Sequence, residues 1–161
     1  MKSYLIQKIK PQYRDEITAI LNKYWGSPKV VSRGHVFYAD QFPGFIAIEN
    51  RTIIGLITYH IEGDQCEIVT LNSLKEGIGI GSQLIKSVKL VAENRRCCRV
   101  WLITTNDNIA AIQFYQKRGF HMVAIYPDAI QKSRRLKPSI PLLGHQGIPI
   151  RDEIEFEILL Q

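Results

Sequence analysis

The sequence predicts an α/β fold of the α+β type, in which one mixed sheet of about six to seven strands is flanked by helices. Residues 45–71 are rich in β-branched and aromatic residues and contain tight-turn signals, which indicates three antiparallel strands in a meander. Apolar residues then recur at helical spacing over 80–94, and a continuous apolar run follows over 99–104. Together with the strand over 66–71, these segments predict a right-handed parallel βαβ crossover.

The remaining N-terminal elements are a strand, a helix and an irregular stretch. Residues 4–9 are expected to form a first strand, and a helix then runs from Pro11 to about Tyr24. Residues 25–42 contain glycine and proline, so we expect an irregular segment with short helix there.

The C-terminal part is predicted to contain one further helix and two strands. The helix begins near Asn106 or Asp107, either of which can act as its N-cap, and Gly119 suits its C-terminal end. Strands are predicted over 122–126 and 153–160.

Composition and length exclude several classes of protein. The 161 residues suffice for one domain, residues 1–161, with a single core. No apolar run approaches the roughly 20 residues that span a bilayer, and the N-terminus lacks the features of a signal peptide. Three cysteines, two of them adjacent, argue against a disulfide framework. We therefore expect a cytoplasmic protein with no membrane partner.

The net charge of +6 favours polyanionic ligands, but it also serves solubility. Nucleic acid and a phosphate-rich cofactor are both candidates. The densest basic group is local rather than a long stripe with interleaved aromatic residues, which makes nucleic acid the less favoured partner. The group comprises Lys132, Arg134, Arg135 and Lys137. We expect these residues to be surface charges or to contact an anionic ligand group. The four histidines show no metal-ligand spacing, so no metal is expected.

A glycine-rich loop with Gly77, Gly79 and Gly81 leads into the helix over 80–94. Its backbone can curve around an anion, with exposed N–H groups and the positive end of the helix dipole directed at phosphate. No lysine followed by serine or threonine comes after Gly81, so the loop does not match a nucleotide-triphosphate P-loop. The dinucleotide fingerprint fits only loosely, because no acidic residue follows about 20 residues later. A glycine-rich turn without a ligand is the alternative.

The helix that follows carries polar groups on a face that should be buried. Asn108, Ala111, Ile112 and Tyr115 share this face by helical spacing. The amide and the phenol are either hydrogen-bonded residues at the edge of the core or the lining of a ligand channel, in which the small Ala111 allows close approach.

These two segments resemble motifs of the GNAT superfamily of acetyl-CoA-dependent N-acetyltransferases. The family's loop has a glutamine or arginine before a glycine-x-glycine pair; Gly79 and Gly81 match the pair, and Glu76 departs from the first position. The second motif is matched without exception, at Asn108, Ala111, Tyr115, Gly119 and Phe120. The resemblance covers roughly residues 45–126, which would form the acetyl-CoA-binding core.

The resemblance implies acetyl-CoA as the co-substrate and a primary amine as the acceptor, with direct attack in a ternary complex. The edge of the strand at residues 69–71 would pair with the pantetheine arm, and this strand would splay from residues 99–104. The glycine-rich loop would hold the pyrophosphate. Tyr115 would protonate the departing thiolate, and a backbone N–H near Leu71 would bind the oxyanion. The implied coenzyme contacts are Val69, Thr70, Leu71, Gly77, Gly79, Gly81, Ser82, Asn108, Ala111 and Tyr115.

The general base is expected to be Glu67, which lies on the strand that leads into the site. Alternation along a strand places Glu67 on one face with Val69 and Leu71. Partial burial there would raise its pKa toward a useful value. The alternative is a surface carboxylate paired with a neighbouring strand, and Tyr59 and His60 are weaker candidates for the base.

Acidic residues of the last strand share one face, which we expect to be solvated; they are Glu153, Glu155 and Glu157. Alternatively, Asp152 or Glu153 attracts a cationic acceptor. Trp25 and Tyr38 are candidates for walls of the acceptor pocket, and the last strand is a candidate edge for a homodimer.

Two other functions stay open at this level. A non-catalytic acyl-CoA-binding or sensing module of the same fold would bind the coenzyme without transferring its acetyl group. A nucleic-acid-binding module would leave Asn108 and Tyr115 unexplained. Polyamines, amino sugars, amino acids and protein lysines are all candidate acceptors.

Overall fold

The structure is a computed structural model that describes residues 3–161. Its seven-stranded sheet contains, in spatial order, β1 (Leu5–Lys8), β4 (Gly44–Glu49), β5 (Thr52–Glu62), β6 (Gln65–Ser73), β7 (Arg99–Thr105), β9 (Glu153–Leu159) and β8 (His121–Tyr126). A separate hairpin consists of β2 (Lys29–Ser32) and β3 (His35–Tyr38). The helices are η1 (Pro11–Tyr13), α1 (Arg14–Trp25), η2 (Ala39–Gln41), α2 (Ile80–Asn94), α3 (Ile109–Lys117), α4 (Ala129–Leu136) and η3 (His145–Gly147).

The sheet topology confirms the predicted α+β fold with its meander and crossover. β4, β5 and β6 are neighbouring antiparallel strands. β6 and β7 are parallel, and α2 connects them. The other neighbouring pairs of the sheet, including those of β9 with β7 and with β8, are antiparallel.

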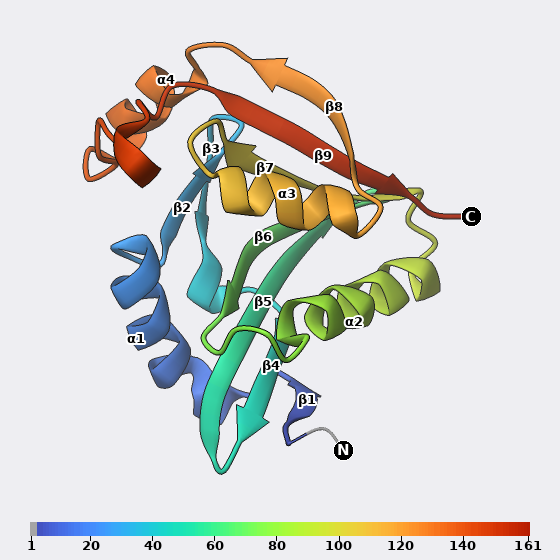
Figure 1. The fold of residues 1–161 in the computed structure, drawn as a ribbon. Helices are drawn as coiled ribbons and strands as arrows, with labels where there is room; N and C mark the ends of the chain where they lie inside the picture. The colour runs from blue at the N-terminus through green and yellow to red at the C-terminus, as the bar shows by residue number, and fades with distance from the viewer. Residues whose placement is uncertain (1–2) are drawn as a thin grey trace.

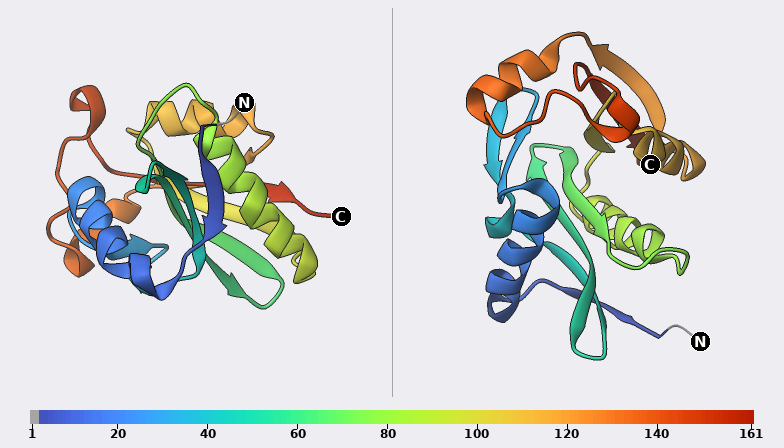
Figure 2. Two further views of the ribbon diagram at one scale, coloured as in Figure 1. Left: turned by 90° about the horizontal axis from the view of Figure 1, so that it is seen from below. Right: turned by 60° about the vertical axis from the view of Figure 1, so that its left-hand side comes forward.

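Helices cover both faces of the sheet. α1 lies on one face, and α2 lies on the other (Figures 1 and 2). Ile17 and Leu21 of α1 belong to a buried cluster with Ile46 and Leu56 of the sheet. A stripe of α2 at helical spacing belongs to the second and larger cluster; it comprises Ile80, Leu84, Ile85, Val88 and Ala92. Each face of the meander therefore has its own apolar core.

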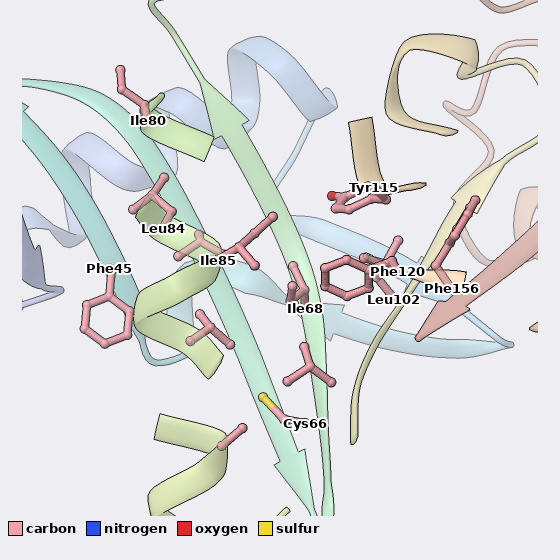
Figure 3. Packing of buried hydrophobic residues seen from close by; sticks show 14 of the residues in the cluster. Phe45, Cys66, Ile68, Ile80, Leu84, Ile85, Leu102, Tyr115, Phe120 and Phe156 are labelled. Atoms are coloured by element: carbon pink, nitrogen blue, oxygen red, sulfur yellow. The ribbon is translucent and has the colours of Figure 1, made fainter. Parts of the chain in front are cut away.

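The larger cluster extends from α2 across β6 to α3 and β9. Ile68 of β6 lies between Ile85 of α2 on one side and Phe120 on the other (Figure 3). Tyr115 of α3 packs with its ring centroid 5.6 Å from that of Phe120 and 6.1 Å from that of Phe156 in β9. This packing fixes α3 against the end of the sheet where β6 and β7 meet.

Residues 25–42 differ in part from the sequence prediction: the expected short helix is present as η2, but residues 29–38 form the β2–β3 hairpin rather than an irregular segment. The turn between the strands is made by Arg33 and Gly34, whose φ angles are +50° and +76°. Positive φ at both turn residues matches the right-handed twist of a tight hairpin. Val30 on one strand is buried and joins the core cluster of α1, so apolar burial holds the hairpin in place.

Helix α4 was also not predicted. Its Ile130 and Ser133 are buried, whereas Lys132 and Arg135 are exposed. Within residues 3–161, no helix has both the length and the apolar character that a membrane span requires.

Candidate active site

The two parallel strands separate in the middle of the sheet. Their pairing runs from Gln65 opposite Arg99 to Ile68 opposite Leu102 and stops there, although β6 continues to Ser73 and β7 to Thr105. Beyond this point, the edge of β6 that faces β7 has no strand partner within the described chain. A cavity lies on each face of the sheet beside this separation.

The first cavity lies on the α3 face and has a volume of about 220 Å³. It is formed where the end of β6, the first turn of α2 and one side of α3 meet. Its lining residues are Leu71, Ser73, Gly81, Ala110, Ala111, Phe114 and Tyr115. Leu71, Gly81, Ala111 and Tyr115, four of the residues expected to bind the coenzyme, therefore lie around one space.

The glycine loop at the start of α2 adopts a backbone that favours glycine. Gly77 and Gly79 both have φ of +78°, and a Cβ atom on either would meet no atom within 4 Å. Glycine is therefore favoured by its backbone freedom and not by a lack of space. Gly79 is the N-cap of α2, and no side chain caps this helix end. The first N–H groups of α2 are thus free of side-chain acceptors.

Gly81 and Ser82 have partners within the protein. A Cβ atom on Gly81 would lie 2.8 Å from Cζ of Phe114, so the absence of a side chain lets α2 approach α3 closely. The Ser82 Oγ accepts a hydrogen bond from Nε of Arg118 at 2.8 Å. Both residues hold the loop against α3, which is a structural role in addition to the predicted contact with pyrophosphate.

Asn108 and Tyr115 do not line the same cavity, contrary to the expectation of a shared channel. Asn108 is the N-cap of α3, and its Oδ1 accepts a hydrogen bond from the backbone N–H of Ala111 at 3.2 Å. Its side chain is therefore turned to the helix end, and it borders the cavity on the other face of the sheet. Capping gives the asparagine of the motif a structural role, and its contact with the coenzyme stays a prediction.

Tyr115 is buried and surrounded by aromatic rings. Phe114 and Phe120 pack edge-on against it with centroids at 5.2 and 5.6 Å. Burial raises the pKa of the Tyr115 hydroxyl above its ordinary value of 10, because ionisation would place a charge in an apolar site. The hydroxyl is therefore protonated at neutral pH and can act as a proton donor.

The second cavity lies on the opposite face, under the β2–β3 hairpin and α4, and has a volume of about 200 Å³. Most of its wall is apolar, and the polar exceptions include Ser32, Glu67, Lys137 and Glu153. Trp25 lies in the wall as expected, whereas Tyr38 does not line the cavity and is exposed. The sequence predicted either a surface charge or a contact with an anionic ligand group at Lys137; its side chain is buried, so the surface position is wrong.

Glu67 is a buried carboxylate at the edge of this second cavity, with only 5% of its surface exposed. Ser32 Oγ of the hairpin donates a hydrogen bond to Glu67 Oε1 at 2.7 Å. Loss of solvent raises the pKa of Glu67 to about 7, and Glu153 and Glu155 contribute to the increase, whereas the Ser32 hydrogen bond opposes it. No ion pair to Glu67 occurs in residues 3–161.

A β-bulge in β6 corrects the predicted strand faces. The pairing with β5 shifts register between Thr58 and Tyr59, so Val69 has no direct partner. Glu67 lines the second cavity together with Val69, but Leu71 lines the first cavity with Tyr115. Simple alternation would have placed Leu71 beside Glu67, and the extra residue reverses it. The bulge thus directs the two predicted catalytic regions of β6 to opposite faces.

The other candidates for the base lie less favourably. Tyr59 packs with Phe45 in the larger core cluster, on the face opposite Glu67. His60 pairs with Glu67 across the strands, but its ring stacks on Phe42 at 5.4 Å.

The acidic face of β9 is covered, and the expectation of a solvated face is wrong. Glu153 and Glu155 are buried, and Glu157 is partly buried. Arg99 of β7 donates to Glu155 and to Glu157 at 2.8 Å each, and Arg33 of the hairpin lies 3.6 Å from Glu153. These arginines come from distant segments, so the alternation within β9 alone could not reveal them.

The remaining predictions about ligands concern metal ions and the basic group. No group of three or more histidine, cysteine, aspartate or glutamate residues that could hold a metal ion is present in the described part of the chain. In the basic group, Arg134 donates to the backbone carbonyl of Ile150 and Lys137 to that of Trp25. These hydrogen bonds tie the α4 region to the segment before β9 and to the end of α1.

The chain resembles known proteins in sequence and in fold. The family model for the acetyltransferase (GNAT) family matches residues 13–120. The chain is 48% identical over 141 residues to the uncharacterized protein YdhI of Bacillus subtilis (strain 168), a match covering 87% of this chain and 88% of that protein. The uncharacterized protein YxbD of the same organism is 41% identical over 142 residues, covering 88% and 89%.

A solved structure shows the same fold. The GNAT family acetyltransferase from Elizabethkingia anophelis with acetyl-CoA bound superposes with a TM-score of 0.72, over 99% of this chain and 100% of that chain, at 19% identity. At this identity the likeness concerns the fold alone, while the family model covers well over half of the sequence. This chain is a member of the GNAT acetyltransferase family.

Proposed function

We propose that the protein transfers the acetyl group of acetyl-CoA to a primary amine by direct attack in a ternary complex. The observation that carries the proposal is the pair of cavities on opposite faces of the separated strands β6 and β7. One cavity contains a buried proton donor, Tyr115, and the other contains a buried carboxylate, Glu67, whose pKa is about 7. In this proposal the acid and the base would act from opposite faces of the separated strands.

Acetyl-CoA would occupy the α3 face. Its pyrophosphate would bind to the N–H groups of Gly77, Gly79 and the first turn of α2, which have no side-chain cap. Its pantetheine arm would pair with the free edge of β6 at residues 69–71 and bring the thioester near Leu71 and Tyr115. The bound acetyl-CoA of the Elizabethkingia anophelis structure supports this use of the fold.

The amine would enter from the second cavity. Glu67 would remove a proton from the bound ammonium, directly or through a water molecule, and the nitrogen lone pair would attack the thioester carbon. Collapse of the tetrahedral intermediate breaks the carbon–sulfur bond, and the coenzyme A thiolate takes the proton of the Tyr115 hydroxyl. The nitrogen loses its second proton to solvent as the amide forms, and solvent returns a proton to Tyr115. A base with a pKa near the working pH is suited to such proton transfer.

A thiol-release assay with acetyl-CoA and a mixed panel of primary amines tests the proposal. Tyr115→Phe should lower kcat by about 100-fold, the usual range for loss of a general acid, while the Kd for acetyl-CoA changes little. The matched control is Tyr38→Phe, at an exposed tyrosine outside both cavities. Acetyl-CoA binding without thiol release for any amine would instead identify a coenzyme-binding module.

A further inference from the structure

Lys137 is a buried cation in the wall of the second cavity, which would hold the acceptor and is named the acceptor cavity. Only 9% of its surface is exposed, and its Nζ donates to the backbone carbonyl of Trp25 at 2.8 Å. No carboxylate lies within ion-pair distance of this ammonium in residues 3–161. An ammonium group has three donors, and a buried charge without a counter-ion is costly. An anion that entered the cavity would therefore gain a charge-assisted hydrogen bond.

Lys137 and Glu67 both line the cavity and are linked to opposite ends of strand β2. Strand β2 runs along the cavity, and its Ser32 donates to Glu67. At the other end of β2, the Lys29 side chain donates to the carbonyl of Leu136, the residue before Lys137. A strand rises about 3.3 Å per residue, so Ser32 and Lys29 are about 10 Å apart along β2. The lowered pKa of Lys137, caused by burial and by the nearby Lys29, fits a second positive charge at this end.

Most of the wall between these two ends is apolar. It is contributed by the hairpin, β7, α4 and the segment before β9, and its apolar side chains include Val30, Ile103, Ile130, Ile140 and Ile150. Of the other polar side chains in the wall, Thr105, Asn108 and Ser133 already have hydrogen-bond partners within the protein. An apolar segment of a ligand therefore suits this stretch better than a polyamine or an amino sugar does. A ligand that fits all three regions has a cation, an apolar middle and an anion.

On the basis of the proposed function, we propose that the acceptor is an amino carboxylate whose primary amine and carboxylate are joined by an apolar spacer. The amine lies at Glu67, next to the thioester, and the carboxylate binds to the Lys137 ammonium. The backbone position of Trp25 is fixed in part by its indole Nε1, which donates to Asn72 at 2.7 Å. The carbonyl that holds Lys137 is thereby tied to β6, on which Glu67 also lies.

The test compares ω-amino carboxylates of increasing chain length with alkylamines of the same carbon number. In the thiol-release assay we expect kcat/KM of wild type to be at least about tenfold higher for 6-aminohexanoate than for hexylamine, as a charge-assisted hydrogen bond provides. Lys137→Met should bring this ratio close to one, and Lys137→Arg should restore part of it. Lys132→Met, at an exposed lysine of the same helix, should leave the ratio unchanged.

A binding measurement separates this inference from the proposed activity. We expect 6-aminohexanoate to raise the melting temperature of wild type with bound coenzyme A more than hexylamine does, and Lys137→Met to remove the difference. Such shifts without turnover would contradict the acetyltransferase proposal but support the anion site. Equal kcat/KM and equal shifts for the two ligands in wild type, or a preference that persists in a folded Lys137→Met protein, would overturn the inference.

Discussion

Replacement of Glu67 by glutamine tests how strongly burial raises the pKa of this carboxyl group. The two side chains have nearly the same shape, and the amide carbonyl of the glutamine can accept the Ser32 hydrogen bond as the carboxylate does. The replacement therefore removes an ionisable group and changes little else. The difference in free energy of unfolding between the variant and wild type should depend on pH, and burial of Glu67 determines the direction of this dependence.

The sign and size of this dependence follow from the pKa. Burial raises the pKa from its ordinary value of 4.5 to about 7, so the folded protein holds a proton that the unfolded chain releases. The favourable contribution is complete below pH 4.5 and is lost as the pH rises to about 7. Each pKa unit corresponds to about 1.4 kcal/mol, which gives about 3 kcal/mol in total and about 2–3 kcal/mol between pH 5 and pH 8.

Urea unfolding of wild type and Glu67→Gln at pH 5 and pH 8 measures this quantity. We expect the variant to gain about 2–3 kcal/mol relative to wild type as the pH rises between these values. The control is Glu16→Gln at an exposed glutamate of α1, which makes the same replacement outside the cavity. A difference between Glu67→Gln and wild type that is constant from pH 5 to pH 8 would refute the reasoning, because Glu67 would then titrate alike in both states.

Two further replacements test the structure around the site. Gly81→Ala places a Cβ atom 2.8 Å from Phe114 and should lower the free energy of unfolding in urea by about 1–3 kcal/mol. Calorimetry should also show weaker acetyl-CoA binding. An unchanged free energy of unfolding would contradict the close contact between α2 and α3. Arg99→Gln leaves Glu155 and Glu157 without their shared cation and should cost about 2 kcal/mol in urea unfolding. An unchanged free energy of unfolding would contradict a stabilising role of these ion pairs.

The fold was largely accessible from the sequence because its signals are local. The helical stripe of α2 and the continuous apolar run of β7 lie side by side in the chain, and they predicted the parallel crossover. The glycines before α2 indicated a bend that the positive φ of Gly77 and Gly79 provides. Each of these signals depends on backbone conformation or on burial within one short segment.

The acceptor side was less accessible, because its residues meet only through tertiary contacts. The acidic alternation of β9 resembles a solvated strand, and its coverage depends on Arg99 and on the hairpin residue Arg33. The short hairpin strands contain too few residues for a clear period, and their turn at Arg33 and Gly34 requires positive φ at a residue other than glycine. The sequence around Lys137 is typical of a surface cation, and the side chain is buried only because α4 packs against the cavity.

The β-bulge near Val69 had no sequence signal that we could identify. It changes which side chains share a face, and this determines that Leu71 lies with Tyr115 while Glu67 lies with the acceptor cavity. Strict alternation is a good first rule for strands, and one inserted residue is enough to reverse it.

The most direct test of the central claim is the pH dependence of acetyl transfer from acetyl-CoA to the best amine of the panel. In wild type, kcat/KM should rise with pH through an apparent pKa of about 7, which is that of Glu67 in the free protein. Glu67→Gln should remove this step and lower kcat/KM at pH 8 by about 100-fold or more, with acetyl-CoA affinity retained. An unchanged rate and an unchanged pH profile in Glu67→Gln would contradict the assignment of Glu67 as the base.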